Sequence, residues 1–298
     1  MRNGEITWLG KDNKVASKGQ KDRNVKKSRL FYSVVSAIIL ISGVVLPSVI
    51  SSYQQEASAL IAPAKYNGSK GTLTFAFGHA FKSELPAIIN VTRYNFGGNI
   101  SPVETKIGDI GYMTQTQLLN YQNAGWQILS HSMTHPRIDS TTSSSVLKYQ
   151  IVQSKSALTN IGLCITGYES PFDIITTNSA VYIKNNYKYA IINPNRQNTV
   201  YSITHDGLKW NFPTAIHYYG VGKGLSIHDF ATAKKQIDYA INNHTYLVLN
   251  FHQIDSSTNP YSTYPSVFWQ ILQYAKQKSD AGQLNVENSV QALGISCP

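Results

Sequence analysis

Along residues 71–298, short apolar runs typical of strands alternate with longer segments whose apolar residues have helical spacing. Short runs rich in apolar residues predict strands at 73–77, 126–129, 189–192, 245–251 and 283–286. Longer segments with apolar residues three or four positions apart predict helices at 114–124, 145–160, 179–186, 230–242 and 265–278. No internal repeat is present. Because helices and strands alternate, this part of the chain is predicted to form one domain with a parallel α/β sheet, either open or closed into a barrel.

The first 70 residues follow a different pattern. Residues 30–50 form a 21-residue apolar stretch directly after Lys26, Lys27 and Arg29, long enough to span a hydrocarbon core of about 30 Å. The positive-inside rule predicts that the leader, residues 1–29, stays in the cytoplasm and that the rest is exported. Residues 51–70 are predicted to be a linker. Ala57-Ser58-Ala59 is typical of a signal cleavage site, so both a single-pass anchor in the cell membrane and secretion after cleavage stay open.

Charge and cysteine content narrow the possible partners. The formal net charge is +10, and residues 1–29 alone hold nine Lys or Arg against three Asp or Glu. Most of the basicity therefore belongs to the leader, and nucleic acid is not an expected partner. The two cysteines, Cys164 and Cys297, allow one disulfide without requiring it.

The most informative local pattern is a pair of histidines, His131 and His135, just after the apolar residues Ile128-Leu129. Strand ends carry the functional groups of α/β proteins, and imidazole is the commonest protein ligand for zinc. Pro136 argues against a helical His-x-x-x-His pair of the metalloprotease type. Both residues are therefore candidate metal ligands on a loop; the alternative is that they are ordinary polar loop residues.

Four further segments extend this pattern in a recognisable order. They are Gly111-Tyr112-Met113-Thr114 leading to His131-Ser132-Met133-Thr134-His135-Pro136, Gln153–Leu158 followed by Gly167–Phe172, Asn186–Ala190, and Leu247–Ile254. Together with Thr74–Gly78, this order resembles the polysaccharide deacetylase family, the chitooligosaccharide deacetylase homology domain of carbohydrate esterase family 4. The resemblance covers about residues 71–295. It implies a distorted (β/α)7-type barrel preceded by one N-terminal transmembrane or signal helix.

The resemblance also implies a reaction. Members of the family hydrolyse the carbon–nitrogen amide bond of N-acetylated glycans with a divalent metal, here expected to be zinc. It assigns His131 and His135 as metal ligands and His252 as the general acid that protonates the leaving amine. The expected partners are a cell-surface or extracellular glycan polymer and, through residues 30–50, the membrane. A buried, hydrogen-bonded histidine is the other interpretation of His252.

Three departures from the family pattern affect this interpretation. The first motif, Thr-Phe-Asp-Asp-Gly, is matched by Thr74–Gly78, so that Ala76 and Phe77 replace the base and the third metal ligand. In a second register, Gly78 and His79 occupy the two Asp positions, and His79 completes a three-histidine site with no base. Glu169-Ser170 precede Pro171 where the family has an Arg. Asp173, in place of a frequent Gly, either helps to bind metal or caps a loop.

Three hypotheses follow. The first is an exported, metal-assisted deacetylase with a divergent site. The second is a catalytically inactive pseudoenzyme that binds glycan or a surface partner, and the third is a different metal hydrolase on the same scaffold. Because a missing base costs a factor of roughly 10² to 10⁴, slow or absent turnover is expected. In the first register, Ala76→Asp with Phe77→Asp should restore metal affinity.

Overall fold

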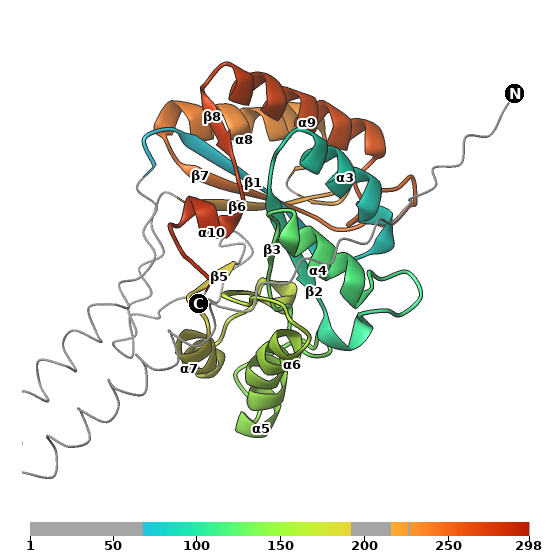
Figure 1. The fold of residues 1–298 in the computed structure, drawn as a ribbon, viewed down its shortest axis with the longest axis vertical. Helices are drawn as coiled ribbons and strands as arrows, with labels where there is room; N and C mark the ends of the chain where they lie inside the picture. Colours follow the sequence, from blue (N-terminus) through green and yellow to red (C-terminus); the bar gives the residue numbers. More distant parts are fainter. Residues whose placement is uncertain (1–67, 192–215, 226, 298) are drawn as a thin grey trace, which may run out of the picture. The chain divides into compact units, whose positions relative to one another are not determined.

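The computed structural model describes residues 68–191, 216–225 and 227–297, all within the unit Pro63–Pro298 (Figure 1). The predicted leader at 1–29, the apolar segment at 30–50 and most of the linker at 51–70 lie outside the described residues. Within the described ranges, no helix is both long enough and apolar enough to cross a membrane.

The core of the domain is a parallel sheet. Its strand order is β3 (Gln127–Ile128), β2 (Gly98–Pro102), β1 (Gly71–His79), β7 (Tyr246–Phe251) and β6 (Ile216–Val221), and β8 (Leu284–Val286) pairs with the start of β1. Strands β4 (Gly167–Glu169) and β5 (Tyr189–Ile191) pair with each other and join β3 through a parallel bridge between Ser130 and Tyr168. The prediction of a parallel α/β sheet is confirmed.

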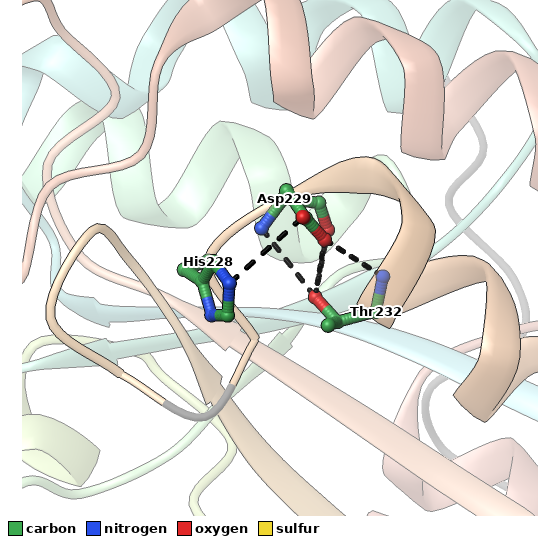
Figure 2. A network of polar contacts seen from close by, with 3 residues as sticks. All are labelled: His228, Asp229 and Thr232. Carbon is green, nitrogen blue, oxygen red and sulfur yellow. Dashed lines mark hydrogen bonds and ion pairs between the residues drawn. The ribbon is translucent and has the colours of Figure 1, made fainter.

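The predicted helices are present with small shifts at their ends. They are α4 (Gln115–Asn123), α7 (Thr177–Asn186), α8 (Phe230–Asn243), α9 (Pro265–Asp280) and, for the segment 145–160, α5 (Ser144–Leu147), the π-helical segment Lys148–Gln153 and α6 (Ser154–Asn160). Thr114 caps α4 as predicted, since its side chain accepts a hydrogen bond from the backbone of Gln117. Asp229 caps α8 in the same way, accepting from the Thr232 backbone at 2.8 Å, with the exposed His228 beside it (Figure 2).

Several elements have no counterpart in the sequence prediction. They are α3 (Leu85–Arg93), β2, β4, β6, α10 (Ser289–Ala292) and the short 3₁₀ turns Lys82–Glu84, Glu104–Lys106 and Pro171–Asp173. Strand β2 reads Gly-Asn-Ile-Ser-Pro, a composition typical of a turn, and yet all five residues are buried. Its strand conformation comes from pairing with β1 on one side and β3 on the other.

Strand β1 separates two cores. On its outer side, helices α8 and α9 lie next to each other over the sheet (Figure 1). Phe75 and Phe77 pack there against Phe251 and Phe268, with ring centroids 5.1–6.1 Å apart. These four aromatic side chains are fully buried. Aromatic contacts of this kind anchor the helical layer to the sheet.

The inner side of β1 faces a second, smaller core. Ala76 packs there in a cluster with Tyr189 of β5 and Tyr246 and Val248 of β7. Strands β5 and β7 are far apart in the pairing order, so this contact requires the sheet to curve strongly around an interior. Polar groups also meet on this inner side, where the Thr74 hydroxyl lies 2.9 Å from the Tyr246 hydroxyl.

The two faces of β1 decide between the two registers of the first motif. Phe77 belongs to the outer aromatic core, and Ala76 belongs to the inner apolar cluster; neither side chain has any exposed surface. The register that assigns the missing carboxylate positions to Ala76 and Phe77 is therefore wrong, because neither residue reaches a cavity. His79, at the end of the strand, does reach one.

Candidate metal and catalytic site

Four histidines line one cavity of about 450 Å³ at the carboxyl ends of the strands. His79 ends β1, His131 and His135 follow β3, and His252 follows β7. Carboxyl ends of parallel strands meet at one edge of a sheet, which is why segments so far apart in sequence converge here. The predicted convergence of His131, His135 and His252 is confirmed, and His79 joins them.

The imidazoles lie within ligand distance of one another. The possible ligand atoms of His79, His131 and His135 are all within 4.8 Å of each other, and the Nε2 atoms of His79 and His135 are 3.1 Å apart. The ring of His252 lies 5.1 Å from the ring of His79, measured between centroids. His79 thus stands between the predicted ligand pair and the predicted general acid.

Hydrogen bonding and burial favour neutral rings in this cluster. His131 Nδ1 is 2.9 Å from the backbone carbonyl oxygen of Glu169, so the hydrogen sits on Nδ1 and the Nε2 lone pair is left for a ligand bond. Burial lowers the pKa of His79 and of His131 well below the usual range, and the neighbouring imidazoles add to both shifts. Burial also lowers the pKa of His135.

This donor set fits a divalent ion. Imidazole nitrogens bound to one tetrahedral zinc ion lie roughly 3.3 Å apart, given zinc–nitrogen bonds of about 2.0–2.1 Å. The Nε2 atoms of His79 and His135, 3.1 Å apart, are close to that spacing, and the ligand atoms of all three histidines lie within 4.8 Å of one another. The backbone carbonyl behind His131 is also the kind of partner that metal-ligating histidines use.

The loops that carry the histidines are held in unusual backbone conformations. His79, Ala80, Ser132 and His135 all have positive φ angles, which lie between 59° and 71°. Such conformations cost about 1 kcal/mol or more each in residues other than glycine. The Ser132 side chain accepts a hydrogen bond from the His135 backbone at 2.9 Å, which closes the turn that brings His135 back towards His131.

One acidic residue near the histidines, Glu169, was not identified as a site residue from the sequence. Glu169, at the end of β4, is buried and lines the cavity. Its Oε1 accepts a hydrogen bond of 2.8 Å from Asn250 Nδ2 on β7. The signal in the sequence was weak, since Glu169 stands out only as a charged residue before Pro171 where the family that the chain resembles has an Arg. Asp173 also lines the cavity, nearer to solvent.

Aromatic side chains border the histidines. The Phe81 ring stacks on His79 at 5.0 Å, and the Phe172 ring lies 4.8 Å from His135. Tyr261 lies 5.8 Å from His252. Phe172 and Tyr261 are 47% and 45% exposed, so both present ring faces or edges at the cavity mouth.

Comparison with known proteins bears on the fold. No protein-family model and no curated protein sequence matches the chain. Among solved structures, the Bc1960 peptidoglycan N-acetylglucosamine deacetylase matches with a TM-score of 0.50 and 11% identity, over 78% of this chain and 92% of that one. The domain has a polysaccharide deacetylase-like fold.

Two further solved structures belong to carbohydrate esterase family 4 by their descriptions. A family 4 acetyl xylan esterase from Clostridium thermocellum with a cobalt ion has a TM-score of 0.48 and 11% identity, over 76% of this chain and 93% of that one. A mutant of BA3943, described as a family 4 pseudoenzyme with restored activity, has a TM-score of 0.49 and 12% identity, over 78% and 72%.

Proposed function

We propose that this protein is a metal-dependent hydrolase of the polysaccharide deacetylase type, which removes acetyl groups from an N-acetylated cell-surface or extracellular glycan. The observation that carries the proposal is the convergence of His79, His131 and His135 within 4.8 Å of one another at the strand ends of a deacetylase-like fold. In this assignment the three imidazoles hold the ion, zinc being the expected metal. A bound divalent ion polarises an amide carbonyl and lowers the pKa of water.

The chain's own residues supply orientation and a proton. The Glu169 carbonyl fixes the His131 ring through Nδ1, which directs Nε2 into the cavity. His252, beside His79 at the mouth, is assigned as the general acid that protonates the leaving nitrogen. Asp173 lies at the rim and has no assigned role.

The cavity suits a sugar ligand. Its volume of about 450 Å³ is in the range of small-molecule sites. The exposed rings of Phe172 and Tyr261 offer apolar faces beside the polar histidine cluster. Aromatic rings beside polar groups match the mixed apolar and hydroxylated faces of a pyranose.

The same proposal includes the finer architecture and the location. The curved sheet supports a distorted barrel of about seven strands, in the order β5, β4, β3, β2, β1, β7 and β6. The apolar stretch at 30–50, with basic residues before it, supports export of the domain, either anchored in the cell membrane or secreted. The disulfide between Cys164 and Cys297 agrees with an oxidising compartment.

A second candidate is a glycan-binding protein without hydrolytic activity. The observation that favours it is Gly78, which has no side chain where the second register of the first motif requires the base. Both candidates bind glycan, but only the first releases acetate.

The test uses the full chain purified in detergent, stripped of metal and reloaded with zinc or cobalt. We expect one ion per chain and release of acetate from N-acetylglucosamine oligomers, with both lost in His79→Ala. His228→Ala is the matched control, because His228 is exposed and lies outside the cavity. Metal binding without acetate release would favour the non-hydrolytic candidate. Absence of metal binding would contradict the assignment of His79, His131 and His135 as metal ligands and the metal-dependent reaction in which His252 is the general acid.

A further inference from the structure

Of the described residues that line the cavity, two carry carboxylates, Glu169 and Asp173. Glu169 is only 3% exposed and ends β4, where side chains alternate between the two faces of the strand. A Cβ on Gly167, on the same face as Glu169, would lie 2.4 Å from the ring of Tyr189, which packs in the inner cluster with Ala76. The face shared by Gly167 and Glu169 therefore points to the interior, and Glu169 lies at the carboxyl end of the strand.

Two hydrogen bonds hold Glu169 beside the histidine cluster. Its backbone carbonyl accepts from His131 Nδ1 at 2.9 Å, and its carboxylate accepts from Asn250 Nδ2 at 2.8 Å. The second bond crosses the interior from β7 to β4, which are not neighbours in the sheet. A neutral amide donating to a carboxylate fixes its position and favours its charged form.

Gly78 lies next to the hydrogen-bonded pair of Asn250 and Glu169. A Cβ built on Gly78 would lie 3.6 Å from Asn250 Nδ2 and 3.7 Å from Asn250 Oδ1, which are ordinary contact distances. A side chain on Gly78 would therefore enter the region that the Asn250–Glu169 pair borders. The carboxylate that β1 lacks at this point is available from β4.

We propose that Glu169 is the general base of this site and that Asn250 is the residue that positions it. The assignment rests on the proposed deacetylation. It removes the main objection to activity, namely that the first motif has no carboxylate.

The step balances with the residues present. A water oxygen forms the new bond to the acetyl carbon while one of its protons passes to a Glu169 carboxylate oxygen. The carbon–nitrogen bond then breaks, and the amine nitrogen keeps the electron pair and takes a proton from protonated His252. Acetic acid ionises to acetate, and the proton held by Glu169 passes to His252, which restores both groups.

The test compares four variants of the full, metal-loaded chain with wild type: Glu169→Gln, Glu169→Gln with Gly78→Asp, Asp173→Asn and Glu287→Gln. The amide oxygen of Gln can still accept from Asn250, so the fold and the cavity shape are retained. Glu287 is the matched control, because it is a half-buried glutamate at the opposite end of β1, where its backbone bonds to Leu73. Metal content, melting temperature, kcat and KM are measured for each.

We expect Glu169→Gln to keep its metal and a KM within about threefold of wild type while kcat falls by roughly 10² to 10⁴, the usual contribution of a general base. Adding Gly78→Asp should restore kcat at least about tenfold, since a carboxylate then enters the same space from β1. A residue needed only for folding would not be rescued by a carboxylate on another strand. Glu287→Gln should behave as wild type.

Each other outcome overturns an identifiable claim. Wild-type turnover that survives Glu169→Gln, or is lost instead in Asp173→Asn, overturns the assignment of Glu169 and leaves the proposed function intact. Loss of metal or of folding in Glu169→Gln without rescue by Gly78→Asp reduces Glu169 to a structural role and also overturns it. A wild-type chain that binds metal but releases no acetate overturns the proposed function itself.

Discussion

The two ends of the sheet differ in how their backbone is built. Eight described residues other than glycine have positive φ angles. Four of them, His79, His135, Phe172 and Asp173, line the cavity at the carboxyl ends of the strands, and two more, Ala80 and Ser132, directly follow the lining residues His79 and His131. The other two, Asn95 and His244, follow helices, where such a residue commonly ends the helix. Strain is therefore concentrated where the imidazoles converge, as expected for a functional site that the surrounding core holds in place.

The two ends also differ in their polar groups. Near the amino end of β1, the side chains of Thr74, Tyr246 and Ser289 form a chain of hydrogen bonds that continues to Asn99. Near the carboxyl end, the polar side chains point towards a cavity and include imidazoles in ligand geometry. The comparison indicates that the amino end stabilises the sheet and that the carboxyl end is built for a ligand.

The largest expected effect tests the boundary between these regions within β1. Phe77→Asp should destabilise the protein by more than about 4 kcal/mol, because it creates a cavity among aromatic rings and buries an unpaired charge. Gly78→Asp, one residue nearer the mouth, should cost clearly less, since no aromatic packing is lost and its Cβ meets only ordinary contacts beside the Asn250 amide, so that repulsion from the Glu169 carboxylate is the main cost. Chemical denaturation of both variants checks the difference. Equal costs would show that the two positions do not lie in different environments.

The next effect concerns metal. His79→Ala should weaken zinc binding by more than about 100-fold, because even residues that only orient ligands change metal affinity by 10- to 100-fold. Titration of the stripped chain with zinc measures the affinity, and His244→Asn is a control at a positive-φ position that follows a helix. Unchanged affinity in His79→Ala would limit the site to His131 and His135.

A smaller effect depends on pH. Glu84 is fully buried, and this burial raises the pKa of its carboxyl group well above the usual range, although a backbone hydrogen bond from Phe81 opposes the shift. A raised folded-state pKa means that the stability this group contributes is complete below the unfolded pKa and is lost as the pH rises through the folded one. Glu84→Gln should therefore melt at a higher temperature than wild type at pH 8 and at a similar one at pH 4. A difference that is the same at both pH values would contradict the assignment.

The smallest effect measures the strain directly. Ala80→Gly should stabilise the fold by about 0.5–1 kcal/mol, because glycine adopts a φ of 59° without a steric penalty. Asn95→Gly should gain less than about 0.5 kcal/mol, because asparagine already tolerates this region. Melting curves of the two variants compare the mouth with a helix end. A larger gain at Asn95 would mean that the strain is not concentrated at the site.

The sequence by itself determined the local elements and the chemistry of one loop. Helix periods, the Thr114 cap and the strand that follows α4 depend on residues a few positions apart, so they could be read without a fold. Pro136 likewise excluded a helical histidine pair. These features predicted the parallel α/β class and a site with His131 and His135 at a strand end, and the family resemblance added His252 to that site.

Only the tertiary structure decided which residues complete that site. Strand period places Phe77 and Gly78 on opposite faces of β1, but it does not say which face meets the helices and which meets the interior. Packing against Phe251 and Phe268 settles that question, and it brings His79 to the mouth. The contact between Asn250 and Glu169 joins residues 81 positions apart across a curved sheet, and no local pattern encodes such a contact, because it depends on the curvature that all the strands produce together.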